Sequence, residues 1–273
     1  MPKVIDISKE NAAYQHLEVL KRNRNKRKQY REVFVEGVAC INALVRARWQ
    51  VTSVAYARER KLSRWAQGVI AESSPEKILR LSLPLMEKLS DRSDPSELIL
   101  TAERRERRLE QIAVDERSIV VIFDRPSNHG NLGSIIRTCD GLGATAVVTM
   151  GHSVDIFDPT VLRSSLGAFF RLPVVECPSP KELAQWIDRV RTQVPAFRLL
   201  GAVADASTPL YEVDLAGPVG VVLGNEAHGV SRAIGELVDA NVSIPMRGEV
   251  DSLNVACAGT AIVYEITRQR ACR

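Results

Sequence analysis

One stretch decides the fold of this chain: VGVVLGNEAHGVSRAIGELVDANVSIPMRGEVDSLNVACAGTAIVY (residues 219–264). Residues 219–223 are uninterrupted apolar residues, which predicts a strand buried on both faces. Gly224, Asn225 and Glu226 follow directly, at the carboxyl end where open α/β sheets bind their ligands. The end of this strand is therefore a candidate ligand site.

The second half of the stretch leads back to the same sheet edge. A short strand predicted over 241–244 ends at Pro245, and a polar loop follows it. We predict that Asp251 or Ser252 caps the next helix, because such side chains accept hydrogen bonds from the first helical amides. Those amides then point towards the edge of the sheet at which the two strands end. Two strand ends and one helix start together predict a ligand pocket.

Composition limits the class of protein. The 273 residues are 45% hydrophobic, enough for a sizeable core and for two domains. No run of about 18 apolar residues occurs, and the N-terminus lacks the charged-then-apolar pattern of an export signal. The five cysteines are widely spaced, with no CxxC pair or Cys/His cluster, which argues against a metal site and a disulfide framework. We therefore expect a cytoplasmic protein without a metal ion.

Charge is distributed unevenly along the chain. The formal net charge is +4, but residues 1–117 hold 24 basic and 17 acidic residues, a balance of +7. Residues 118–273 hold 13 basic and 16 acidic residues, a balance of −3. This asymmetry is expected if the N-terminal part contacts a polyanion and the C-terminal part binds a small ligand.

A basic run, KRNRNKRKQYR, occupies residues 21–31 and contains seven basic residues and no acidic one. It is either a contact for RNA phosphates or a solvated linker, and composition alone does not choose between them. Its position before a predicted strand and amphipathic helix (32–49) favours RNA. The candidate RNA-binding residues of the run are Arg22, Arg24, Lys26, Arg27 and Lys28.

Strands and helices alternate along most of the chain, which predicts α/β layers. Residues 103–117 are dense in both charge signs and form the predicted connector, so we expect domains at 1–111 and 112–273. In the second domain, alternation over 118–204 predicts a mostly parallel sheet with helices on both faces. Arg163, in a short helix predicted over 158–168, is a further candidate for contact with RNA or with a partner subunit.

A helix is predicted to start near Leu132, which leaves two readings for Asn131: a simple N-cap or a functional residue. Several enzyme classes are excluded. No strand is followed by G-x-G-x-x-G opening a helix, and no G-x-x-x-x-G-K-[ST] occurs, which argues against dinucleotide-binding and P-loop enzymes. Glu226 and His228 lack a nearby Ser or Cys nucleophile in a recognisable elbow, which argues against a hydrolase.

Three ordered motifs carry a family resemblance. NHGNLGSIIRT (128–138), LGNEAHGVS (223–231) and IPMRGEVDSLNVACA (244–258) resemble the motifs of the SpoU/TrmH family, in the SPOUT superfamily. The resemblance implies an S-adenosylmethionine-dependent RNA 2′-O-ribose methyltransferase that works as a homodimer. It also implies a deep trefoil knot in the C-terminal domain, and an α/β RNA-binding domain before it that resembles ribosomal protein L30e.

The resemblance also assigns site residues. It places the cofactor against a set of residues from the second and third motifs, namely Leu223, Gly224, Asn225, Ile244, Met246, Ser252 and Leu253. It assigns catalysis to Asn131, Arg137, Glu226, Ser252 and Asn254. Because an arginine stays protonated, we expect Arg137 to clamp a phosphate and favour the alkoxide rather than to act as a base.

Within the family, the resemblance extends over nearly the whole chain to a methyltransferase of 23S rRNA, so 23S rRNA is the expected substrate. Two alternatives stay open. One is a tRNA 2′-O-ribose methyltransferase of the same fold, and the other is a non-catalytic RNA-binding or ribosome-assembly protein.

Overall fold

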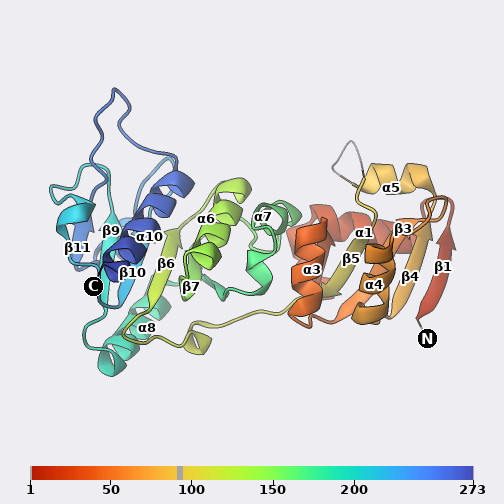
Figure 1. The fold of residues 1–273 in the computed structure, drawn as a ribbon, viewed down its shortest axis with the longest axis horizontal. Helices are drawn as coiled ribbons and strands as arrows, with labels where there is room; N and C mark the ends of the chain where they lie inside the picture. Colours follow the sequence, from red (N-terminus) through yellow and green to blue (C-terminus); the bar gives the residue numbers. More distant parts are fainter. Residues whose placement is uncertain (1, 91–94, 273) are drawn as a thin grey trace. The chain divides into compact units, whose positions relative to one another are not determined.

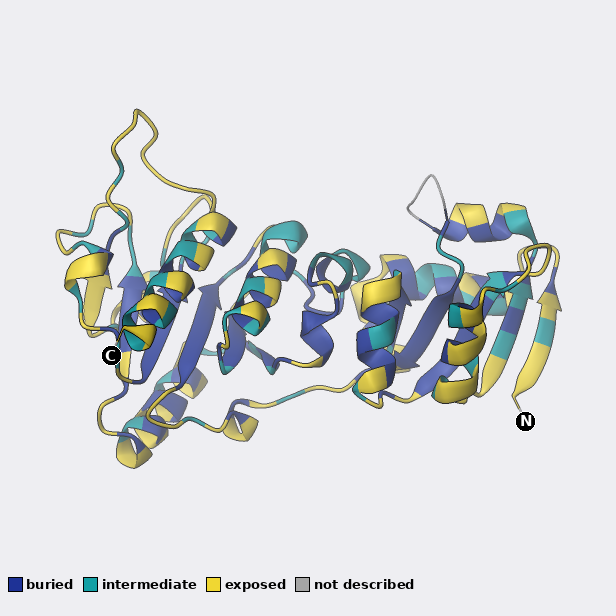
Figure 2. Cartoon of the chain, viewed as in Figure 1, coloured by how far each residue is buried: buried dark blue, intermediate teal, exposed yellow. Residues whose placement is uncertain are grey.

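The computed structural model describes residues 2–90 and 95–272, which divide into two compact units. Unit 1 consists of Met1–Arg105 and Phe157–Arg171, and unit 2 of Glu106–Ile156 and Leu172–Arg273. Figure 1 traces the chain through both, and Figure 2 shows that in each the inner strands of the sheet are deeply buried, whereas the edge strands β1 and β11 are largely exposed. Each unit thus has its own sheet and core.

Unit 1 is built on a mixed sheet with strand order β1-β4-β3-β5-β2. The pairs of β4 with β1 and β3 are parallel, whereas β5 is antiparallel to β3 and β2. The strands are β1 (Lys3–Ile7), β2 (Glu32–Glu36), β3 (Val51–Ala57), β4 (Lys77–Leu81) and β5 (Ile99–Glu103). The helices are α1 (Ala12–Arg22), α2 (Arg24–Tyr30), α3 (Val38–Arg46), α4 (Arg64–Ser73), α5 (Leu83–Leu89), α7 (Pro159–Ser164) and the 3-10 turn η2 (Ala168–Phe170).

The segment Phe157–Arg171, from the middle of the chain, packs within unit 1. Cys40 Sγ on α3 donates to the carbonyl of Leu162 at 3.1 Å. Gly167 has φ +86, and a Cβ there would lie 2.5 Å from Ala43 Cβ, so only glycine permits this close approach. The Trp49 and Phe170 rings meet edge to face, 5.1 Å between centroids. This segment is an integral part of the unit 1 core.

Unit 2 is built on a parallel sheet with strand order β11-β9-β10-β6-β7-β8. The strands are β6 (Ile119–Asp124), β7 (Ala146–Met150), β8 (Val174–Cys177), β9 (Arg198–Ala202), β10 (Val219–Leu223) and β11 (Ala240–Val242). The helices are α6 (His129–Gly141), α8 (Pro180–Gln193), α9 (Arg232–Gly235) and α10 (Val255–Ala271), with 3-10 turns η1 (Leu109–Gln111) and η3 (Leu210–Glu212). The α/β class and the parallel sheet predicted from the sequence are confirmed.

Helices cover both faces of the unit 2 sheet. Val222 of β10 belongs to the apolar cluster formed with Leu183 and Ile187 of α8. The next residue, Leu223, faces the other way, where a Cβ on Gly259 of α10 would lie 2.9 Å from its Cδ1. On that face α6 and α10 lie side by side (Figure 1), and Thr138 and Thr260 hydroxyls hydrogen bond at 2.9 Å. The sheet edge between these helices is where the pocket forms.

The sequence did not predict β1, α2 and α9, and it predicted the wrong caps for α6 and α10. Asn128, not Asn131, caps α6, because Asn128 Oδ1 accepts from the Asn131 amide at 3.0 Å. Asn254, not Asp251 or Ser252, caps α10, accepting from the Ala256 amide at 2.9 Å. Within the described part of the chain, no helix has the length and apolar character to cross a membrane.

Candidate functional site

A cavity of about 650 Å³ lies at the carboxyl ends of β9, β10 and β11, beside the start of α10. Small-molecule pockets fall in this size range. It brings together all of the expected cofactor residues: Leu223, Gly224, Asn225, Ile244, Met246, Ser252 and Leu253. The expected catalytic residues Asn131, Glu226, Ser252 and Asn254 line the same cavity, whereas Arg137 is not among the described residues that line it.

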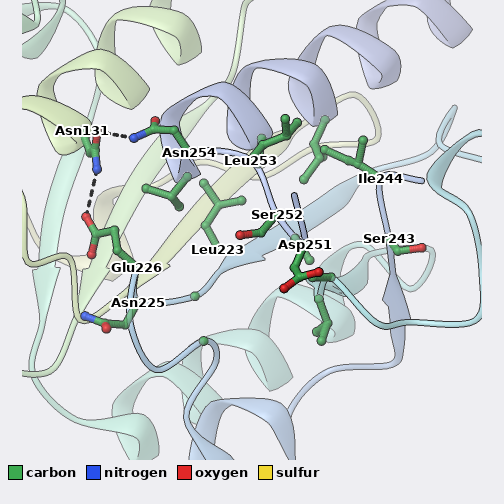
Figure 3. Close-up of a pocket in the computed structure, with 18 of the residues that line it drawn as sticks. Asn131, Leu223, Asn225, Glu226, Ser243, Ile244, Asp251, Ser252, Leu253 and Asn254 are labelled. Atoms are coloured by element: carbon green, nitrogen blue, oxygen red, sulfur yellow. Dashed lines mark hydrogen bonds between the residues drawn. The ribbon is translucent and has the colours of Figure 1, made fainter. Parts of the chain in front are cut away.

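Three side chains from three separate motifs form one hydrogen-bonded chain on the rim of the cavity (Figure 3). Asn254 Nδ2 donates to Asn131 Oδ1 at 3.1 Å, and Asn131 Nδ2 donates to Glu226 Oε1 at 3.2 Å. The position of Asn254 fixes which amide atom donates in each bond. Because Asn254 Oδ1 caps α10, its Nδ2 must face Asn131. Asn131 then turns its own Nδ2 towards the carboxylate. We call these three residues the Asn–Asn–Glu chain.

Glu226 is held as a carboxylate. Desolvation by itself raises its pKa, but hydrogen bonds from Ser127, from its own backbone amide and from Asn131 outweigh that cost. The net result is a pKa below the ordinary glutamate value. Ser127 supplies two of these bonds, from Oγ at 2.6 Å and from the amide at 3.2 Å, both to Oε2. A carboxylate with a lowered pKa is a weak base but a good orienting acceptor.

The loop that follows β10 is shaped by Gly224 and Asn225. A Cβ on Gly224 would lie 2.5 Å from the carbonyl carbon of Gly229, so this position requires glycine. Asn225 Nδ2 donates to the Arg125 carbonyl at 2.7 Å, while its Oδ1 accepts from the His228 amide at 3.0 Å. Asn225 therefore lines the cavity, but its side-chain amide is engaged in the hydrogen bonds that hold the loop.

The cavity combines an apolar floor with a polar rim. Leu223, Val242 and Ile262 are almost fully buried in the floor. Leu253, 40% exposed, stands on the rim beside Ser252 (Figure 3). This arrangement suits a ligand with a flat apolar part and polar ends, which S-adenosylmethionine has. Among the described residues, no group of three or more His, Cys, Asp and Glu side chains is placed to hold a metal ion.

Sequence reasoning missed part of the lining. The additional residues are Ser127, Asn128, Ala202, Val203, Ala204, Leu210, Val242 and Ser243, among others. A usable signal existed for most of them, because they lie within the last residues of the strands predicted over 118–123, 197–204 and 241–244 or in the segments that follow these strands. Carboxyl ends of neighbouring parallel strands meet at one edge of a sheet.

Arg137 is exposed on α6, six residues after Asn131. Helical geometry puts it about 9 Å further along the axis and about 120° round from Asn131. Within this chain it therefore stands apart from the Asn–Asn–Glu chain.

One candidate RNA-binding residue is contradicted by the structure. Arg27 is only 2% exposed; it donates to the carbonyls of Leu20 and Lys21 and forms an ion pair with Asp158 at 3.1 Å. Because the guanidinium is enclosed within unit 1, Arg27 cannot contact RNA from this position. The reason is that the basic run is helical rather than a linker, so one residue of α2 must face inward.

The other candidates remain accessible to different degrees. Arg22, Arg24 and Lys28 are exposed, whereas Lys26 and Arg163 are partly buried. Lys26 Nζ lies 5.6 Å from the centroid of the Tyr30 ring and donates to Gln29 at 3.0 Å. Their contact with RNA stays a prediction.

Known proteins resemble this chain over most of its length. The model of the SpoU rRNA methylase family matches residues 118–264, and that of the SpoU L30e-like domain matches residues 11–101. The chain is 38% identical over 269 residues to a 23S rRNA (uridine(2479)-2′-O)-methyltransferase of Streptomyces viridochromogenes, covering 98% of this chain and 94% of the relative. It is 33% identical over 147 residues to the 23S rRNA (guanosine(2553)-2′-O)-methyltransferase RlmP of Bacillus subtilis, covering 54% of this chain and 57% of that one.

A solved structure matches along nearly the whole chain. The crystal structure of the SpoU methyltransferase AviRb from Streptomyces viridochromogenes, in complex with the cofactor AdoMet, superposes with a TM-score of 0.91 at 38% identity. The match covers 96% of this chain and 99% of that one. On these matches and on the three motifs that meet at the cavity, the chain belongs to the SpoU rRNA methylase family, with a SpoU L30e-like domain before the methylase domain.

Proposed function

We propose that this protein transfers a methyl group from S-adenosylmethionine to a ribose 2′-hydroxyl of 23S rRNA. The proposal rests on one observation above all: the Asn–Asn–Glu chain joins the three motifs on the rim of a cavity suited to the cofactor. The relatives named as 23S rRNA 2′-O-methyltransferases support the choice of RNA.

The bound cofactor supplies an electrophilic methyl carbon. The residues of this chain supply alignment, which is the main requirement of a displacement between two fixed groups. Leu223, Val242 and Ile262 exclude water from the floor. Asn131, fixed at both ends by Glu226 and Asn254, presents a defined rim to the ribose. Ser252 stands beside the same opening with an exposed side chain.

In this proposal Arg137 holds an RNA phosphate next to the target ribose and stabilises the alkoxide, which lowers the cost of removing the hydroxyl proton. Its exposed place on α6 supports contact with bound RNA more than contact with its own cavity. Arg137→Ala is expected to lower kcat and RNA affinity together. Near-normal turnover with unaltered RNA affinity would show that the assignment is wrong.

We further propose a homodimer, a cytoplasmic location and a trefoil knot around α10. The exposed face of α10, which includes Tyr264 at 58% exposure, supports a subunit contact, and light scattering of the purified protein tests it. The close approach of Gly259 to Leu223 supports tight threading of the C-terminal segment. Pulling the chain from both ends tests the knot, because a knotted chain extends to a shorter final length.

The deciding experiment uses radiolabelled S-adenosylmethionine with unmodified 23S rRNA, 16S rRNA, bulk tRNA and 50S subunits. Label in 23S rRNA that resists alkaline cleavage at one position is the expected result. Label in tRNA alone would keep the chemistry and replace the substrate. No label in any RNA, together with no cofactor binding by calorimetry, would favour a non-catalytic RNA-binding protein.

A further inference from the structure

We propose that Ser127 is a positioning residue for methyl transfer, which holds the Glu226 carboxylate and, through it, Asn131 in the orientation that the reaction needs. This inference rests on the proposed function. It adds to the Asn–Asn–Glu chain a fourth member, from the loop between β6 and α6, that no motif of the sequence identified.

Ser127 makes two bonds to one oxygen. Its Oγ donates to Glu226 Oε2 at 2.6 Å, and its amide donates to the same atom at 3.2 Å. The other oxygen, Oε1, accepts from Asn131 Nδ2 at 3.2 Å. Because Ser127 and Asn131 together bind both oxygens of the carboxylate, Glu226 has a single side-chain orientation. This orientation in turn fixes the side-chain amide of Asn131.

The backbone of the loop that carries Glu226 is held by other contacts. Asn225 Nδ2 donates to the Arg125 carbonyl at 2.7 Å, and the Arg125 guanidinium donates to the Gly229 carbonyl at 3.1 Å. The Ser231 amide donates to Asp124 Oδ2 at 2.6 Å. Removing the Ser127 hydroxyl therefore loosens one oxygen of the Glu226 carboxylate without opening the loop.

The consequence for the reaction is specific. A hydroxyl that donates to a carboxylate forms one of the stronger hydrogen bonds in proteins, and an alanine at position 127 leaves Oε2 of Glu226 with only the longer bond from the backbone amide. The carboxylate then rotates towards water, and the Asn131 amide loses its fixed partner. The residues of the cofactor floor are untouched, so the loss falls on kcat.

The test compares Ser127→Ala, Ser127→Thr and the control Ser207→Ala in steady-state methylation of 23S rRNA. Ser207 is an exposed serine of the same unit and is not among the described residues that line the cavity. Ser127→Ala is expected to lower kcat about tenfold and to change the KM for S-adenosylmethionine less than about twofold. Ser127→Thr, which keeps the hydroxyl, is expected to restore kcat.

A second readout does not depend on turnover. In carbon-13 NMR of labelled glutamate, the pKa of Glu226 is expected to rise in Ser127→Ala and to stay unchanged in Ser207→Ala. If the wild type is active and Ser127→Ala has the same kcat as Ser207→Ala, the role of Ser127 is overturned while the proposed function stands. A wild type that methylates no RNA removes the proposed function, and the role of Ser127 in it.

Discussion

At the scale of single residues, the site depends on which way two asparagine amides face. Asn254 serves two elements at once, because Oδ1 caps α10 while Nδ2 donates to Asn131. An asparagine at position 254 can therefore cap the helix and position Asn131 at the same time. Serine or aspartate also caps a helix, but neither presents a donor amide on its other side.

Asn254→Asp separates these two uses. The introduced carboxylate still caps α10, so we expect the free energy of unfolding to change by less than about 0.5 kcal/mol. Asn131 must then turn its Nδ2 towards this new carboxylate and its Oδ1 towards Glu226, which breaks the Asn–Asn–Glu chain. Methyl transfer is therefore expected to fall about tenfold or more. Thermal unfolding checks the predicted stability, and initial rates check the predicted loss of methyl transfer. Equal initial rates in the wild type and Asn254→Asp would contradict the role of the amide.

The lowered pKa of Glu226 predicts a dependence of stability on pH. Because the folded pKa lies below the ordinary value of 4.5, the carboxylate adds stability above that value, and the gain is lost as pH falls through the folded pKa. Between about pH 5 and pH 3, the wild-type free energy of unfolding should fall more steeply than that of Glu226→Gln. Urea titrations at several pH values measure both slopes, and parallel slopes contradict the prediction.

Two neighbouring basic residues of α2 should behave in opposite ways. Arg27→Ala removes a buried ion pair with Asp158 and should cost about 3 kcal/mol of stability. Lys28 is exposed, so Lys28→Ala should change stability by less than about 0.5 kcal/mol. It should instead reduce the slope of log affinity for 23S rRNA against log salt by about 0.7–0.9. Denaturant unfolding and filter binding over a salt series distinguish them.

At the scale of elements, apolar runs located the buried strands well. β10 occurs at the predicted residues 219–223, because an uninterrupted apolar run has one stable place in a layered α/β fold. Helix starts were harder to predict, because Asn128, Asn131, Asp251, Ser252 and Asn254 are all good caps. Only tertiary contacts select among them. β1 escaped prediction because it is an exposed edge strand with only Ile7 buried.

Gly224→Ala tests the loop after β10 as an element. The added Cβ would lie 2.5 Å from the Gly229 carbonyl carbon and 2.6 Å from the Val230 amide, both backbone atoms that cannot rotate away. The loop must open, which should cost about 1–3 kcal/mol and weaken binding of S-adenosylmethionine. Gly217→Ala, whose Cβ has no neighbour within 4 Å, is the matched control. Calorimetric titration with the cofactor should separate them.

At the scale of the whole molecule, the sequence predicted the α/β class and the family, and both are confirmed. It gave no sign that Phe157–Arg171 packs in unit 1. That segment follows a strand of unit 2 and contains ordinary helix signals, so its partners, Trp49 and Cys40, are set by contacts across more than a hundred residues. Long-range packing of this kind leaves no local sequence pattern from which it could be predicted.

A fragment of residues 1–111 is therefore expected to be incomplete. It lacks Phe169 and Phe170, whose rings lie against Trp49, and it lacks Asp158, the ion-pair partner of Arg27. Such a fragment should bind hydrophobic dyes and unfold at lower denaturant concentration than a fragment that carries residues 157–171 on a flexible linker. Equal stability of the two fragments would show that the segment is dispensable.

The shared segment also sets an order of events during synthesis. A ribosome releases the chain from its N-terminus, yet the N-terminal unit lacks its last piece until residue 171 has left the exit tunnel. By then β6 and β7 of the second unit have already emerged, while their other sheet partners, β10 and β8, have not yet left the ribosome. The nascent chain must keep these apolar strands from aggregating while its first unit closes, so translation speed over residues 124–171 should affect the yield of active protein.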